Sequence, residues 1–199
     1  VYYVVDMAEI PTLQEKKTID TDQDGQISDK ERLKYLAQMA AELPQRLRVL
    51  VNNKPVRLNV RSKDIFITSE PLFLPTLRIE LALFAPLPVP SQAVPLDISY
   101  EDNNYSQRLG WKEIVARAGP SVEIREASVP ESDVSNALRS YPEEMLSKPP
   151  DVRSARITVV AGTGPAVLHD DRPTAAEVSR GEDRFIRLIK TKELTPRIY

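Results

Sequence analysis

The segment TLRIELALF, residues 76–84, constrains the fold more than any other part of the chain. Its apolar side chains occupy every second position: Leu77, Ile79, Leu81 and Leu83. Side chains of a β-strand point alternately to the two faces of a sheet, so this spacing predicts a strand with one buried face. A strand needs partners, and the remaining sequence must therefore supply other strands.

Short segments of the same kind recur along the chain, separated by turn residues and proline-rich connections such as PLPVPSQAVP. They are VYYVV, LRVLV, PVRLNV, PLDISY, GWKEIVARA, SVEIREASV and SARITVV. About eight short strands of this type predict a mainly β fold, either an antiparallel β-sandwich or a partly open barrel. Residues 132–150 interrupt the series and read as a helical excursion or a long ordered loop.

Between the first two strands, the apolar period changes to that of a helix. Pro11 suits the first turn of a short helix, which we expect to carry Ile10, Leu13 and Ile19 on one side. A second helix follows, with Ser28 and Glu31 placed as a capping box and Pro44 at its end. Its expected apolar face is Leu33, Leu36, Ala37, Ala40 and Leu43. We therefore predict an EF-hand-like helix–loop–helix insertion at 11–43.

The character of the chain changes again near residue 162. We expect a β-domain over 1–161, then a linker and a juxtamembrane amphipathic helix over 162–199, which together form a C-terminal helical tail. Residues 180–199 carry six basic side chains against three acidic ones. A basic amphipathic end can lie on a membrane surface. A helix packed on the sheet, with its charges in solvent, explains the same pattern.

Composition excludes several classes of protein. The formal net charge of −2 over 199 residues gives no basic surface of the kind that nucleic acids require. The absence of cysteine removes disulfides, thiolate catalysis and zinc fingers. No apolar run reaches the roughly 18 residues that span a bilayer, so we expect the chain itself to be soluble. Because it opens in a strand without a methionine, we expect a piece of a longer protein.

The loop between the two expected helices, DTDQDGQISDKE at 20–31, has the spacing of a calcium-binding loop. Such loops place oxygen ligands at positions 1, 3, 5, 7, 9 and 12 and a glycine at position 6. Here the ligand positions are Asp20, Asp22, Asp24, Gln26, Ser28 and Glu31, and the glycine is Gly25. Gln26 would contribute its backbone carbonyl, Ser28 would act directly or through water, and Glu31 would bind through both oxygens.

The chain carries one such loop, whereas sensor loops usually come in pairs. We therefore expect Ca²⁺ to act as a structural brace between two helices. Calcium modules outside the cell bind weakly, with dissociation constants on the order of 10⁻⁴ to 10⁻³ M, and a single structural loop suits that environment. The sequence alone thus predicts a β-domain stabilised by calcium, and the weak affinity expected of such a loop favours the outside of a cell.

No enzyme site stands out in the sequence. His169, followed by two aspartates, is the only histidine, and it falls in the expected linker. Glu143 and Glu144 are adjacent, so on a helix they would point to different faces and could not share a substrate. We therefore expect no catalytic residue.

Several segments resemble the extracytoplasmic N-terminal region of bacterial NicO-type nickel/cobalt transporters. They are YVVDMAEIPTLQE, IDTDQDGQISDKE, LRVLVNNKPVRL, LPTLRIELAL, YEDNNYSQRLGWKEIVARAG and YPEEML. The resemblance covers about residues 1–160. Further on, the KELTP segment at 192–196 is like the one that precedes the first membrane helix in those proteins. The histidine-containing transport motif of the family is not in this chain.

The resemblance implies a non-catalytic accessory domain, structural or regulatory, in the cell envelope, on the extracytoplasmic (periplasmic or extracellular) face of the plasma membrane. Its partner would be the permease domain of the same polypeptide, and Ni²⁺ or Co²⁺ would be the transporter's cargo. With one histidine, three methionines and no cysteine, this chain lacks the ligands that hold those ions tightly. The alternative is a stand-alone extracellular β-sandwich that binds a protein or glycan and has a structural calcium site.

Overall fold

The computed structural model describes residues 1–68, 74–88, 90–91, 93–119 and 121–162. Within them the chain is mainly β, with two antiparallel sheets and one pair of α-helices. The predicted class, an antiparallel β fold with a helical insertion, is confirmed. The predicted tail falls almost entirely outside the described residues, as do His169 and the basic segment 180–199.

The first sheet has three described strands in the order β1-β5-β4. They are β1 (Tyr2–Met7), β5 (Thr76–Phe84) and β4 (Asn59–Thr68). The alternation at 76–84 places β5 in the middle, where Ile79 pairs with Val5 on one side and Ile65 on the other. Each of these three side chains is at least nine-tenths buried. The segment that predicted a strand most clearly is therefore the centre of this sheet.

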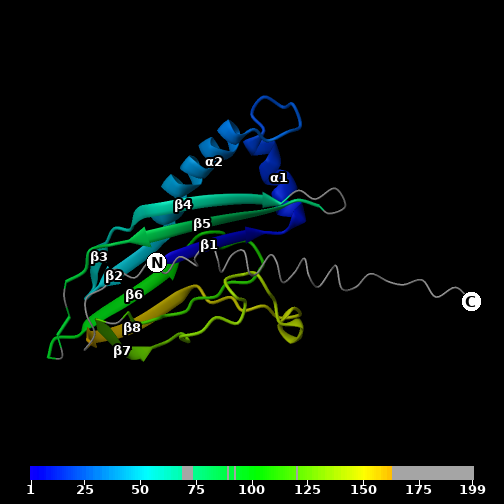
Figure 1. The fold of residues 1–199 in the computed structure, drawn as a ribbon. Coiled ribbons are helices and arrows are strands. Elements are labelled where there is room, and N and C mark those ends of the chain that lie inside the picture. The colour runs from blue at the N-terminus through cyan, green and yellow to red at the C-terminus, as the bar shows by residue number, and fades with distance from the viewer. Residues whose placement is uncertain (69–73, 89, 92, 120, 163–199) are drawn as a thin grey trace, which may run out of the picture. The chain divides into compact units, whose positions relative to one another are not determined.

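Two helices cover one face of the three-stranded sheet, as Figure 1 shows. They are α1 (Glu9–Ile19) and α2 (Asp29–Glu42), and the 3₁₀-helix η1 (Leu43–Arg46) follows α2. Ile19, Tyr35 and Leu36 pack on the apolar face of the sheet and complete the larger core. The predicted insertion at 11–43 is thus present, with its loop between α1 and α2.

Part of each predicted apolar face is confirmed, since Ile19 of α1, Leu36 and Ala40 of α2 and Leu43 of η1 are buried. The rest of each face differs from the prediction. Ile10 and Leu33 are exposed, at 70% and 57%, whereas Thr12 and Tyr35 are buried. Thr12 donates its hydroxyl to the carbonyl of Met7 at 2.9 Å, and this bond turns α1 so that Thr12 faces the sheet. A short helix tied to the preceding strand takes its orientation from that bond, even though its apolar residues favour another one.

The second sheet has five described strands in the order β3-β2-β6-β8-β7. Their bounds are β3 Lys54–Val56, β2 Leu47–Val51, β6 Leu96–Asp102, β8 Ser154–Ala161 and β7 Val122–Ala127. A smaller core of Val51, Leu96 and Val159 lies on it. The two sheets are linked by Tyr3 of β1, whose hydroxyl donates to Asp102 at 3.0 Å.

One predicted strand is wrong. Residues 110–118, GWKEIVARA, form no ladder and make a single parallel bridge, between Lys112 and Asp151. The carboxylate of Glu113 instead accepts hydrogen bonds from the Trp111 ring, the Val134 amide and the Ser135 hydroxyl. These bonds hold the segment against residues 132–150, which form a long ordered loop with one 3₁₀ turn, η2 (Glu143–Met145).

No helix in the described part of the chain is long and apolar enough to cross a membrane.

Candidate metal centre

The loop between α1 and α2 is built by local hydrogen bonds that its sequence supplies. Asp20 accepts from the Gly25 amide at 2.9 Å, and Asp24 accepts from the Gln26 amide at 2.7 Å. Asp22 accepts a longer bond, 3.3 Å, from the amide of Asp24. Gly25 has a φ of +85°, the left-handed region that a glycine adopts most easily. The chain reverses at the predicted position.

This reversal brings three aspartates together. Asp20, Asp22 and Asp24 each offer a carboxylate oxygen, and the three oxygens lie within 4.8 Å of one another. Two unit negative charges about 4 Å apart repel by about 1 kcal/mol in bulk water and by more near a protein surface. Three such carboxylates oppose the closure of the loop unless a positive charge offsets them. The cluster has the donors and the spacing to hold a metal ion.

A second observation concerns Asp20. Its Oδ1 atom is buried and has no hydrogen-bond donor among the described residues, whereas its Oδ2 atom accepts from Gly25. A buried carboxylate oxygen without a partner is costly, because it has lost water and gained nothing in exchange. A cation among the three aspartates would satisfy this oxygen. The residues present therefore fit a metal ion.

Glu31 occupies a different position from the three aspartates. One carboxylate oxygen accepts from the amide of Thr21 at 2.6 Å and from its hydroxyl at 2.9 Å. The other accepts from the amide of Ser28 at 3.0 Å and from its hydroxyl at 2.7 Å. The Ser28 bonds, followed by those of Thr21, lower the pKa of Glu31 to about 2. Glu31 thus joins the two ends of the loop through hydrogen bonds.

Ser28 and Glu31 form the predicted capping box, because the Glu31 amide also donates to the Ser28 hydroxyl. Of the six predicted ligands, the structure gathers Asp20, Asp22 and Asp24 into one cluster and pairs Ser28 with Glu31 in another. Gln26 contributes its amide to the loop. Thr21 was missed by the sequence reasoning, since the second position of a calcium loop carries no ligand and its hydroxyl gave no other signal.

Neither the glutamate pair considered in the sequence nor the tryptophan of the 110–118 segment belongs to a site among the described residues. Glu143 and Glu144 lie on the single turn η2 and are both exposed. Trp111 packs edge-on against Tyr141, with ring centroids 5.3 Å apart. No family model, curated protein or solved structure matches this chain.

Proposed function

We propose that the chain is a non-catalytic accessory domain whose helix–loop–helix corner is braced by Ca²⁺. The observation that carries the proposal is the buried Oδ1 atom of Asp20, which faces no donor among the described residues and belongs to a cluster of three carboxylates. An ion at this point would join the end of α1 to the start of α2. Both helices pack on the three-stranded sheet, so the brace would stabilise the larger core as well.

Calcium is the ion that the donor set favours. The loop offers oxygen atoms alone, and a hard cation takes six to eight of them in a flexible arrangement. Mg²⁺ demands a near-ideal octahedron, and ions of the later transition series prefer nitrogen or sulfur ligands, which the loop lacks. The proposed ligands are Asp20, Asp22, Asp24, Gln26, Ser28 and Glu31. Binding by Ser28 and Glu31 would require them to exchange their present hydrogen bonds.

The transporter context of the proposal rests on the resemblance of residues 1–160 to the extracytoplasmic region of nickel/cobalt permeases. In this proposal the domain lies on the outer face of the plasma membrane and the permease follows on the same polypeptide. The basic segment 180–199 would lie near the membrane surface. The sequence of the gene beyond Tyr199 tests this directly, because several long apolar spans favour a permease and a secreted multidomain protein favours the binding module.

The calcium site is tested by thermal unfolding of the purified chain with increasing Ca²⁺. With a dissociation constant on the order of 10⁻⁴ M, a hundredfold excess of Ca²⁺ stabilises the fold by about 2.7 kcal/mol. For a protein of this size that corresponds to a melting temperature higher by roughly 5 to 11 °C. Equal concentrations of Mg²⁺ should have a smaller effect. A melting temperature that is the same in millimolar Ca²⁺ and in chelator would refute the site.

The variant Asp20→Asn makes the test sharper, because we expect its effect to change sign with calcium. In chelator it should melt above the wild type, since one negative charge is gone and the new amide can donate to the neighbouring carboxylates. In calcium it should melt below the wild type, since a ligand is lost. Asp29→Asn is the matched control: this exposed aspartate pairs with Arg32 outside the cluster, so its effect should not depend on calcium.

A further inference from the structure

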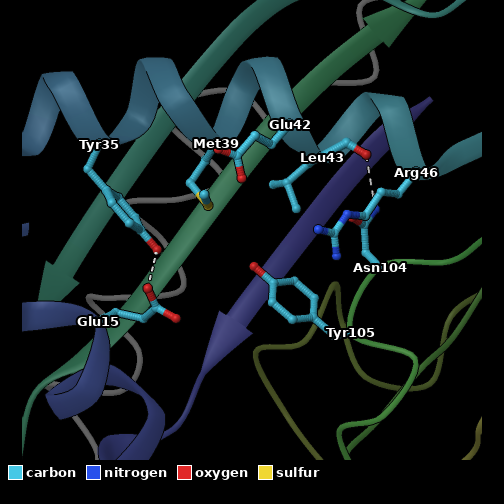
Figure 2. A pocket seen from close by; sticks show the side chains of 8 residues that line it. All are labelled: Glu15, Tyr35, Met39, Glu42, Leu43, Arg46, Asn104 and Tyr105. Carbon is cyan, nitrogen blue, oxygen red and sulfur yellow. Dashed lines mark hydrogen bonds between the residues drawn. The ribbon is translucent and has the colours of Figure 1, made fainter. Parts of the chain in front are cut away.

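A second candidate site lies away from the aspartate cluster. A cavity of about 150 Å³ opens between α1, the C-terminal half of α2, η1 and the loop after β6 (Figure 2). Its lining combines an apolar part, from Met39 and Leu43, with tyrosine rings and charged side chains. An engineered cavity of about 150 Å³ holds a molecule as large as benzene, so the space admits roughly six to eight non-hydrogen atoms.

The walls of the cavity are held by hydrogen bonds between elements. Tyr35 on α2 donates its hydroxyl to Glu15 on α1 at 2.9 Å. The side-chain amide of Asn104, in the loop after β6, donates to the carbonyl of Leu43 at 3.1 Å. Tyr35, Leu43 and Asn104 are all less than 5% exposed. The cavity is therefore formed before any ligand enters, which lowers the entropy lost on binding.

Tyr105 gives an independent indication of function. Its φ is +48°, a left-handed conformation that is unfavourable for a bulky residue and is found mainly where the surrounding structure imposes it. The guanidinium of Arg108 lies over its ring, 5.3 Å from the ring centre. Figure 2 shows the ring and hydroxyl of Tyr105 directed into the cavity.

Two opposite charges face the same cavity without pairing. Glu42 and Arg46 are four residues apart, a spacing that pairs them on a regular α-helix. Here α2 ends at Glu42 and the chain continues as the 3₁₀-helix η1, so the α-helical spacing that would pair the two side chains is not kept. No carboxylate of the described residues lies within ion-pair distance of Arg46. Glu42 accepts one hydrogen bond, from Gln38 at 2.9 Å.

We propose that this cavity binds a free α-amino acid with a small side chain. The ligand's carboxylate would lie against the guanidinium of Arg46, which matches a planar anion with two parallel hydrogen bonds. Its ammonium group would lie between Glu42 and the face of Tyr105, and its side chain would contact Met39. Glu15 is already engaged by Tyr35 and lies 3.7 Å from Arg108, so Glu42 is the carboxylate left for the ammonium group.

The opposite charges of Glu42 and Arg46 favour a ligand that carries both a positive and a negative charge. A simple carboxylic acid would leave Glu42 without a cationic partner, and a simple amine would leave Arg46 without an anionic one. The terminal residue of a peptide carries one of the two charges and has the same defect. The proposal goes beyond the calcium brace, since no residue of 20–31 lines the cavity.

The test is calorimetric titration of the full chain, in chelator so that calcium plays no part. The probes are L-valine and its two single-charge analogues, isobutylamine and isovalerate. We expect valine to bind about tenfold or more tightly than either analogue. No heat of binding with valine, alanine, serine or glycine at about 10 mM, or equal binding of valine and both analogues, would overturn the proposal.

Single variants test which charged group of valine each side chain binds. Arg46→Gln should weaken valine about tenfold and make it bind no better than isobutylamine, whereas Glu42→Gln should make valine bind no better than isovalerate. Both side chains are exposed, so the fold should survive, as melting curves would show. Arg61→Gln, at an exposed arginine on β4, is the matched control and should bind valine as the wild type does. Wild-type affinity in Arg46→Gln would contradict the proposal.

Discussion

At the scale of single residues, Glu31 combines two roles that its sequence position offers. As the twelfth residue of the loop it is a predicted metal ligand, and as the third residue of α2 it closes the capping box. In the structure both oxygens are taken by hydrogen bonds from Thr21 and Ser28, at the two ends of the loop. Glu31 therefore stabilises the corner without any ion, and the aspartates alone carry the unbalanced charge.

This separation predicts different behaviour for Glu31 and Asp20. We expect Glu31→Gln to lower the melting temperature in calcium and also in chelator, because a neutral amide cannot accept the same set of hydrogen bonds. Ser28→Ala removes the cap from the other side and should cost about 1 kcal/mol in chelator, and more in calcium, where a proposed ligand is lost as well. Melting curves measure both effects, with Glu9→Gln, an exposed residue in the first turn of α1, as control. A loss for Glu31→Gln that occurs only in calcium would contradict this account.

At the scale of elements, the sequence predicted those structures whose signal is local. The alternation in β5, the capping box of α2 and the reversal at Gly25 each depend on residues within a few positions, and each is confirmed. The strand β4, with Val60 and Phe66 exposed, has too weak an alternation to be recognised beyond its first residues. The segment at 110–118 is predicted as a strand, but its Glu113 carboxylate accepts hydrogen bonds from the Val134 amide and the Ser135 hydroxyl of a loop about twenty residues away.

The two candidate sites also differ in whether their sequence signal is local. The aspartate cluster could be predicted because a calcium loop has a fixed spacing within twelve residues. The cavity could not, because Glu15, Arg46 and Tyr105 come from separate parts of the chain and only the packing of helices on the sheet brings them together. The conformation of Tyr105 likewise depends on contacts that a sequence does not reveal.

The ion pairs of Asp151, beside the bridge to Lys112, give a prediction of pH dependence. Asp151 accepts hydrogen bonds from Arg153 at 2.7 and 2.8 Å and from Lys112 at 2.9 Å. Arg153 first, and then Lys112, lower the pKa of Asp151 from 3.8 to about 2. Because the pKa is lower in the folded state, the stabilisation is present above about pH 4 and is lost as the pH falls towards 2.

We therefore expect Asp151→Asn to be less stable than the wild type by a constant amount above about pH 4, and we expect this difference to shrink as the pH falls towards 2. Urea unfolding at a series of pH values measures this difference. Glu123→Gln, an exposed carboxylate on β7, serves as control. A difference between Asp151→Asn and the wild type that stays constant down to pH 2 would show that the ion pairs do not stabilise the fold.

In the described domain as a whole, the three-stranded sheet carries the larger of the two cores. Its helix-covered face holds the larger core, and three side chains of β5 there, Leu77, Ile79 and Leu81, are fully buried. Its other face is polar: Glu80 is 6% exposed and accepts hydrogen bonds from Arg78 at 2.7 Å and Arg139 at 3.0 Å. The Arg139 bond ties the ordered loop of residues 132–150 to the same strand. Both the helices and this loop thus depend on β5.

This dependence predicts that a cavity in β5 weakens the described domain as one unit. We expect Ile79→Ala to reduce the free energy of unfolding by about 2 to 5 kcal/mol, because the side chain is fully buried between Val5 and Ile65. Phe66→Ala on β4 is the matched control, since that ring is 46% exposed and its loss should cost much less. Circular dichroism follows the helices and strands, and the fluorescence of Trp111 follows the segment at 110–118. If β5 joins these parts, both signals should show the same unfolding midpoint in Ile79→Ala. A fluorescence transition that keeps its wild-type midpoint would show that the segment at 110–118 folds independently of β5.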